Sequence, residues 1–268
     1  MKRYISIALM IMITIGVIMV PFFAVADEIL FRGVPWGVNP AEARKKIDNP
    51  DLYMRTKYTT GFIGYPSKTV ERLMDRSKNV LYGNPEFFVQ EEGTVRFVGL
   101  FISDNPKVGG YDIQSVDMVF ASDIQDGMVN DDENLSHFAI ATYTFNILDG
   151  KNAYKDLKTK LSSLYGEGKE IGGNYDGTLF YDGKAHDYST HTDTITFTGD
   201  DGTHALLVCI ESVAADDPDN PAFNVTLSYW SEKYEEMIME RDSIVAKEKH
   251  DAQLQIEHSV SEDDLGGL

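Results

Sequence analysis

Residues 137–166 read HFAIATYTFNILDGKNAYKDLKTKLSSLYG, and this stretch decides the fold that we expect. Its first part, 137–148, alternates apolar and polar residues, which is the two-residue period of a β-strand with one buried face. Its second part, 152–165, has apolar residues at helical spacing and ends at Gly166. The residues expected to face the core are Ala139, Ala141, Tyr143, Phe145 and Ile147 in the strand, and Tyr154, Leu157, Leu161 and Leu164 in the helix.

The same two periods continue on either side of this stretch. Asn39 precedes a predicted helix at 40–48 and can cap it, because its side chain can accept a hydrogen bond from the first turn. Upstream we also predict a helix at 67–81, a hairpin of strands at 87–89 and 95–101, and a strand at 116–120. Downstream we predict short strands near 178–181, 194–198, 204–212 and 223–230, with turns at Asp176-Gly177, Asp182-Gly183 and Asp201-Gly202.

The order of these elements predicts an α+β fold, in which helices cover an antiparallel sheet and a helix-then-strands unit occurs twice. A final Glu- and Lys-rich helix has an apolar stripe of about two heptads, which is shorter than a coiled coil requires. The expected organisation is a signal peptide at 1–26, a globular region at 27–230 with halves at 27–121 and 137–230 separated by the polar segment 122–136, a C-terminal helix at 231–258, and a mobile acidic tail at 259–268.

The composition favours a folded, acidic protein. The chain has 268 residues, of which 43% are hydrophobic and 25% are charged, so it can bury a core of ordinary size. Its formal charge is −19, from 24 Lys and Arg against 43 Asp and Glu. Nucleic-acid binding depends on clustered cations, so this charge excludes a nucleic acid from the expected partners.

The N-terminus resembles a secretory signal peptide. Lys2 and Arg3 precede an apolar run that ends in Ala24-Val25-Ala26, the small-residue pattern of a signal-peptidase site. We expect cleavage after Ala26 and release from the cytosol, and the alternative is an uncleaved segment that anchors the chain in a membrane. No Cys lies near this site, so the protein is not expected to be a lipoprotein.

Cys209 is the only cysteine, so no disulfide can form within the chain. It lies in an apolar segment, Ala205–Ile210, in which both faces of a strand would be buried. We therefore expect a buried structural thiol and a fold that depends on its core.

The search for chemistry gives weak metal candidates. His186, His191 and Asp193 lie close together in sequence and have side chains that bind zinc, but residues five apart face opposite sides of an extended strand. No serine-hydrolase, zinc-protease or phosphate-binding motif occurs in the chain. We therefore expect no enzymatic activity and no cofactor. Calcium is considered separately, because a secreted chain meets millimolar calcium and has acidic loops at 123–133 and 216–219. The first loop is not an EF-hand, because Ser122 and Ile124 fall where carboxylates are needed.

The two tryptophans are expected to have different environments. Trp36 lies between Pro35 and Gly37 and is expected to fill the core beneath the first helix. Trp230 has the outward phase of its strand, so it lies either under the C-terminal helix or at the surface. An exposed tryptophan is a common feature of binding surfaces, which makes Trp230 the candidate partner-binding residue.

Three short motifs carry a resemblance. The sequence Phe31-Arg32-Gly33-Val34-Pro35-Trp36-Gly37 before a capped helix resembles the opening motif of uncharacterised secreted proteins and lipoproteins of Gram-positive bacteria, and 108–112 and 157–166 are similar to further motifs of that family. In the order of its elements, the chain is also similar to the tandem fold of the β-lactamase inhibitor protein and of a small outer-membrane assembly lipoprotein. That second resemblance implies protein binding on a sheet surface, and it assigns no site residue to this chain.

The sequence therefore predicts a secreted bacterial binding or structural module without catalysis. Its expected partner is a protein or a cell-envelope component, and contact with a membrane is expected only through an uncleaved N-terminal segment. The alternatives are an extracytoplasmic hydrolase with carboxylates and histidines far apart in sequence, and a calcium-dependent adhesion module.

Overall fold

The computed structural model describes residues 28–47, 52–58, 61–63, 66–67, 88–90, 95–101, 107–130, 132–181 and 184–265. The predicted signal peptide lies outside these residues, as does the helix predicted at 67–81 apart from Ser67. The helices are α2 (Pro40–Ile47), α4 (Gly150–Tyr165), α5 (Glu232–Leu265) and the short 3-10 helix η1 (Glu133–Leu135). The strands are β1 (Leu52–Tyr58), β2 (Gly61–Ile63), β3 (Phe88–Gln90), β4 (Val95–Phe101), β5 (Lys107–Val108), β6 (Tyr111–Ala121), β7 (Asp123–Gln125), β8 (Met128–Asn130), β9 (His137–Phe145), β10 (Lys169–Tyr181), β11 (Lys184–Thr198), β12 (Thr203–Ala214) and β13 (Asp217–Ser231).

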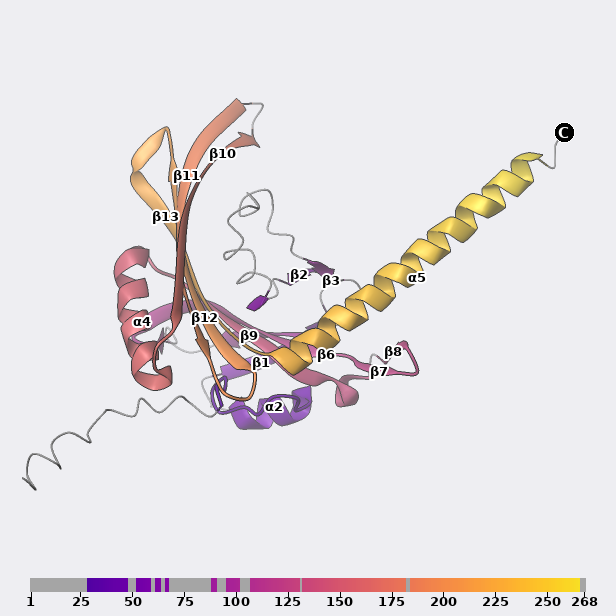
Figure 1. Cartoon of the computed structure of the whole chain (residues 1–268), viewed down its shortest axis with the longest axis horizontal. Coiled ribbons are helices and arrows are strands. Elements are labelled where there is room, and N and C mark those ends of the chain that lie inside the picture. The colour runs from indigo at the N-terminus through magenta and orange to yellow at the C-terminus, as the bar shows by residue number, and fades with distance from the viewer. Residues whose placement is uncertain are drawn as a thin grey trace, which may run out of the picture.

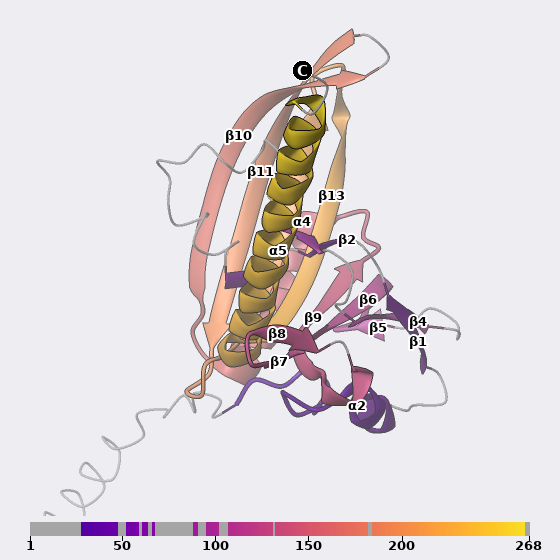
Figure 2. The ribbon, with the colours of Figure 1, turned by 90° about the vertical axis from the view of Figure 1, so that its right-hand side faces the viewer.

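One antiparallel sheet forms the body of the molecule. Its strands follow the order β1-β4-β6-β9-β13-β12-β11-β10, and β5 pairs with β6 at its side. Two small two-stranded sheets, β2–β3 and β7–β8, lie apart from this order. The four long strands β10 to β13 rise together, and α5 leaves the sheet near their lower ends (Figures 1 and 2). The predicted α+β class is confirmed.

The sheet consists of two meanders that meet at their last strands. β1, β4, β6 and β9 follow α2, and β10 to β13 follow α4, so each half is a helix followed by four antiparallel strands. The halves join where Ile140–Thr144 of β9 pairs antiparallel with Thr226–Trp230 of β13. Because equivalent strands pair antiparallel, the halves are related by an approximate twofold axis perpendicular to the sheet, which places both helices on the same face.

The larger core lies on the face covered by α2 and α4. Phe31 is fully buried at the junction of the halves, with its ring 6.1 Å from Phe138, 5.1 Å from Tyr143 and 5.8 Å from Tyr229. Trp36 stacks on Phe138 at 4.7 Å, and its Nε1 donates to the carbonyl of Ile29 at 2.9 Å. The expectation that Trp36 packs into the core is met, and the N-terminal segment seals this face of the sheet.

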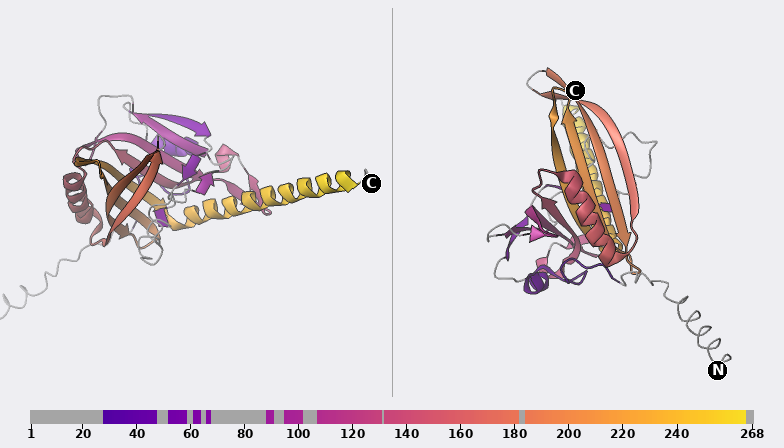
Figure 3. Two further views of the ribbon diagram at one scale, coloured as in Figure 1. Left: turned by 90° about the horizontal axis from the view of Figure 1, so that it is seen from above. Right: turned by 90° about the vertical axis from the view of Figure 1, so that its left-hand side faces the viewer.

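The opposite face of the sheet is covered by the start of α5, as Figure 3 shows. Ile238 is fully buried there against a second core cluster that includes Ile140, Leu206 and Trp230. β12 therefore has apolar residues on both faces, because each face lies under a different helix. Cys209 is buried on the α4 side, as expected.

Glycines explain two of the sequence motifs. Gly37 has φ +78°, and a Cβ at this position would collide with the ring of Tyr234 on α5. Gly109 has φ +61°, and a Cβ there would lie 2.6 Å from Leu157 on α4. At both positions, glycine adopts the left-handed backbone without strain, and its lack of a Cβ lets the turn lie closer to the helix than any other residue would permit.

Local signals at the helix termini are largely confirmed. The backbone N–H of Glu42 donates to Oδ1 of Asn39 at 2.9 Å, so Asn39 caps α2 as predicted. α4 begins two residues earlier than predicted, with Asp149 as its cap, and ends at Gly166, which has φ +85°. Leu164 of the predicted stripe is 66% exposed, and Tyr165 instead packs against the core in the last turn of α4.

Two details of the predicted strands differ from the structure. Ala139 is fully buried, as expected of an inward residue, but a β-bulge between the pairs Val119–Ile140 and Phe120–Phe138 shifts the phase of β9. Phe138 therefore lies in the larger core, and Ala139 lies in the second core cluster. The predicted hairpin of 87–89 and 95–101 does not form, because β3 pairs with β2 while β4 lies between β1 and β6.

The long strands also replace a predicted turn and parts of two loops. Asp176-Gly177 lies inside β10, where Gly177 pairs with Tyr188, because the ladder with β11 runs along the whole of β10 from Lys169 to Tyr181. The turn predicted at Asp182-Gly183 lies outside the described residues. The acidic segment 122–136 contains the β7–β8 hairpin, and β13 begins at Asp217 within the predicted loop at 216–219. α5 continues to Leu265, so the acidic tail predicted from residue 259 is helical at 259–265.

We expect Leu157→Ala to destabilise the fold by about 2–5 kcal/mol, because Leu157 is 2% exposed and its loss leaves a cavity between α4 and the sheet. The matched control is Leu164→Ala in the same helix, where we expect a change within about 0.5 kcal/mol. Urea unfolding followed by circular dichroism measures both values. Equal effects of the two substitutions would contradict the docking of α4 described above.

Candidate functional site

α5 has two parts that differ in burial. The part from Glu232 to Val245, called here the α5 base, contains the residues of the helix that are buried against the sheet, namely Glu235, Ile238 and Arg241. The part from Ala246 to Leu265, called here the α5 arm, is exposed at every residue from 246 to 255. Figure 1 shows the arm extending away from the sheet. The arm is the largest helical surface among the described residues that the core does not use.

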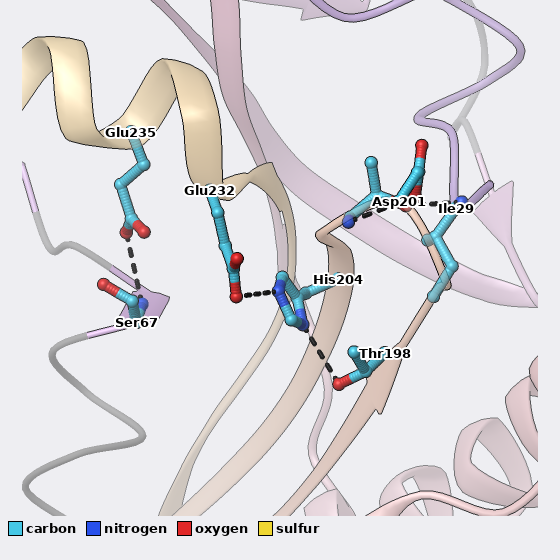
Figure 4. A network of polar contacts seen from close by, with 8 residues as sticks. Ile29, Ser67, Thr198, Asp201, His204, Glu232 and Glu235 are labelled. Atoms are coloured by element: carbon cyan, nitrogen blue, oxygen red, sulfur yellow. Dashed lines mark hydrogen bonds and ion pairs between the residues drawn. The ribbon is translucent and has the colours of Figure 1, made fainter.

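A polar network fixes the start of the α5 base. Nε2 of His204 lies 2.7 Å from Oε1 of Glu232, and its Nδ1 lies 3.1 Å from Oγ1 of Thr198 (Figure 4). The imidazole also stacks on the indole of Trp230 at 4.6 Å. The backbone N–H of Glu232 donates to the carbonyl of Gly202 at 3.0 Å. The first turn of α5 is therefore tied to the β11–β12 hairpin by side-chain and backbone bonds.

Buried charges hold the next turns of the base. Glu235 is 1% exposed, and its Oε1 accepts from the backbone N–H of Ser67 at 3.2 Å. Arg241 is fully buried, and its guanidinium lies 3.0 Å from Oδ1 of Asp242. Charged groups are costly to bury and need defined partners. The Glu235 contact ties α5 to Ser67, whereas the Arg241–Asp242 pair lies within α5 itself.

The α5 arm is polar and acidic. It has two lysines, Lys247 and Lys249, against six acidic residues, namely Glu248, Asp251, Glu257, Glu262, Asp263 and Asp264. Among its described side chains, Leu254 is a large apolar residue with 40% exposure. By sequence, the arm therefore has an excess of negative charge.

The structure brings two of the predicted metal candidates together. On the α4 side of the sheet, Nε2 of His191 lies 3.2 Å from Oδ1 of Asp193, and its Nδ1 lies 2.6 Å from Oδ1 of Asn174 on β10. His186 belongs to the same strand, but its side chain lies outside the described residues. Among the side chains that the structure describes, no group of three or more His, Cys, Asp or Glu converges on a metal position.

An ion pair and the cysteine lie beside this histidine. Glu211, which pairs with His191 across the strands, forms an ion pair with Lys151 of α4 at 2.8 Å. Cys209 lies opposite Asp193 in the same ladder. Burial, with a smaller contribution from the nearby carboxylates of Asp193 and Glu211, raises the pKa of the Cys209 thiol to about 11. The thiol is therefore held in its protonated, unreactive form.

Trp230 does not lie on a binding surface. It is 2% exposed, beneath the α5 base, which is one of the two positions considered from the sequence. The candidate role of Trp230 in direct partner contact is therefore corrected to packing and to positioning of His204. Sequence reasoning missed the contact of His204 with Glu232, because 28 residues separate them. His204 lies in β12 and Glu232 begins α5, and no periodic pattern of the sequence relates these two elements.

The carboxylates of the acidic loops are partly engaged locally. Asp123 accepts from the side chain of Gln125 at 3.0 Å, and Asp132 accepts from the backbone and side chain of Asn134 at 2.9 Å. In the second loop, Asp217 accepts from the side chain of Asn220 at 2.7 Å. These contacts are those of turns, and calcium binding remains a prediction from the sequence alone.

Comparison of the chain with family models, with curated proteins and with solved structures finds no match in any of the three. Within the described part of the chain, no helix is both long and apolar enough to cross a membrane.

We expect His204→Ala to lower stability by about 1–3 kcal/mol, because it removes the stack on Trp230 and the bonds to Glu232 and Thr198. Glu232→Gln should cost less than about 1 kcal/mol, because the Glu232 side chain is 59% exposed and solvent screens the pair. The control is Glu236→Gln, an exposed carboxylate on the same helix. Hydrogen exchange of the α5 base should rise in His204→Ala alone, and unchanged exchange would contradict its role as an anchor.

We expect Cys209 to resist thiol reagents in the folded protein. With a pKa of about 11, roughly one thiol in a thousand is ionised at pH 8, and burial further limits access. Reaction with an aromatic disulfide reagent should be slow in buffer and fast in guanidinium chloride, and the rate is followed by absorbance. Fast modification of the folded chain would show that the thiol is accessible.

Proposed function

We propose that the protein is a non-catalytic, extracytoplasmic binding module of a bacterium, which engages a basic protein partner through the α5 arm. The observation that supports this proposal most is the length of α5. The helix continues 24 residues beyond Arg241, the last buried residue among its described side chains, which is about 36 Å at 1.5 Å per residue. Residues 246–255 of this extension are all exposed and add no buried side chain to the core.

The energetics of the arm favour a binding role. An isolated helix of 12–15 residues is marginally stable in water, and most helices in proteins are held by packing of one face. Ala246 to Gln255 are all exposed, so the arm has little packing of this kind. A partner that covered one side of the arm would supply the missing stabilisation.

The charge of the arm indicates the chemistry of that partner. Two lysines against six acidic residues give the arm an excess of four negative charges, within a chain of net charge −19. Charge complementarity speeds encounter and excludes wrong partners, so a surface rich in Lys and Arg suits this helix best. Export through the N-terminal segment would bring the arm to extracytoplasmic or envelope proteins.

The state of the reactive groups supports binding over catalysis. Both nitrogens of His204 have partners, and the imidazole lies under the α5 base. The Cys209 thiol is held protonated by burial, which raises its pKa to about 11. A general base must be within reach of a substrate proton, and a nucleophile must be activated, so neither residue is arranged for these roles.

We expect a chain that ends at Val245 to keep its fold and to lose its partner. The α5 base remains complete in this variant, so its melting temperature should stay within about 2 °C of that of residues 27–268. Both proteins are immobilised, exposed to the envelope fraction of the producing organism, and compared by mass spectrometry. A basic protein should be enriched about tenfold on the longer chain and released at about 0.5 M salt, where charges are strongly screened.

A charge variant provides the matched control. Glu248→Lys together with Asp251→Lys keeps the helix but removes its negative charge, so capture of the same protein should fall. Lys247→Glu on the same part of the arm should leave capture unchanged or increase it. Identical sets of captured proteins on the long and short chains would contradict the proposal.

A further inference from the structure

We propose that two copies of the chain associate through β10, so that the large sheet continues from one copy into the other. β10 is the last strand in the order of the sheet, and among the described residues it forms a ladder with β11 only. It is 13 residues long. The outward-facing N–H and C=O groups along such an edge can pair with another strand.

β10 lacks the features that protect sheet edges from pairing. It has no proline, and Asp176 is its only charged residue from Ile171 to Tyr181. The far end of β13 offers a direct comparison, because residues 217–222 extend beyond the part that pairs with β9. That second edge has Pro218, Pro221 and two aspartates, which block strand addition. Prolines therefore hinder strand addition at residues 217–222 of β13, whereas no proline hinders it at β10.

The sequence of β10 is suited to pair with itself. In an antiparallel pair with a twofold axis at Tyr175, Asn174 would face Asp176, Gly173 would face Gly177, Gly172 would face Thr178 and Ile171 would face Leu179 of the second copy. A polar pair then lies next to the axis and an apolar pair lies four positions from it. Opposite residues therefore match in polarity at these positions, which favours a second copy of this chain over an unrelated peptide.

When the two copies pair about Tyr175, the pairs next to the twofold axis, Asn174 with Asp176, are favourable. Asn174 and Asp176 are both exposed, and each would face the other in the second copy. Oδ1 of Asn174 lies 2.6 Å from His191 of its own chain, so its amide nitrogen is the end left to donate to the Asp176 carboxylate of the second copy. A register centred on Asp176 would instead place two like charges opposite each other, which is unfavourable.

The oligomeric state in solution tests this inference first. Residues 27–268 should sediment as a dimer that dissociates on dilution. Asn174→Asp places two pairs of like charges across the interface, so the dissociation constant should rise about tenfold or more. Asp176→Asn leaves uncharged groups opposite each other and should keep the dimer. A monomer at every concentration, or a dimer that Asn174→Asp does not weaken, overturns the proposal.

Cross-linking tests the register. Residue 175 lies on the twofold axis, so Tyr175→Cys should form a disulfide-linked dimer under mild oxidation. Thr178→Cys faces residue 172, and its own copy lies six positions away, about 20 Å, so it should not cross-link. Wild-type protein, with Cys209 buried, is the background control. Equal cross-linking of both variants overturns the register.

The chain that ends at Val245 separates this inference from the proposed function. The truncation removes the α5 arm and leaves β10 unchanged, so the short chain should still form the dimer. Loss of the dimer on truncation would assign the interface to α5 and would overturn pairing through β10. Loss of partner capture with the dimer intact bears on the arm alone.

Discussion

The fold depends on the pairing of β9 with β13, where only five residues of each strand join the two meanders into one sheet. Both faces of this short junction are sealed by distant parts of the chain. Phe31 packs on Phe138, Tyr143 and Tyr229 on one face, and Ile238 covers the other. Residues from the beginning, middle and end of the described chain must therefore come together before water is excluded from both faces of the junction. Long-range closure of this kind predicts cooperative folding of the two halves.

The same junction sets the direction of α5. The helix begins at Glu232, directly after Ser231 at the end of β13, so no linker separates it from the sheet. Its first turn is tied to the β11–β12 hairpin, and the buried Glu235 accepts from the backbone N–H of Ser67. An apolar base would tolerate rotation about the helix axis more readily, because hydrophobic contacts are not directional. A helix with polar anchors can present its arm at a fixed angle, which is useful only if the arm meets something.

Sequence reasoning succeeded where a local signal determines the structure, and it failed where a strand can pair with more than one partner. The cap at Asn39, the end of α4 at Gly166 and the inward face of β13 follow from spacing alone. Asp176-Gly177 carries a turn signal, but a turn there would prevent most of the thirteen pairs that β10 forms with β11. The hairpin expected at 87–101 failed for a related reason, because β4 takes both its neighbours from elsewhere in the chain.

The candidate site was the least accessible to sequence reasoning. His204 and Glu232 lie in different elements, and their contact depends on the pairing of β12 with β13 and on the point where α5 begins. The burial of Arg241 could not be anticipated either, because an arginine in a Glu- and Lys-rich helix ordinarily faces solvent.

Pairing through β10 and binding through the α5 arm would reinforce each other. Each copy contributes one arm, so a dimer carries two, and the second arm binds at the effective concentration set by the first. A partner displayed repeatedly on a cell envelope would then be held more tightly than the affinity of one acidic helix allows. Divalent binding would strengthen the weak, salt-sensitive contacts that single arms make. Pairing through β10, an edge strand without a proline, would therefore serve the attachment of the arms.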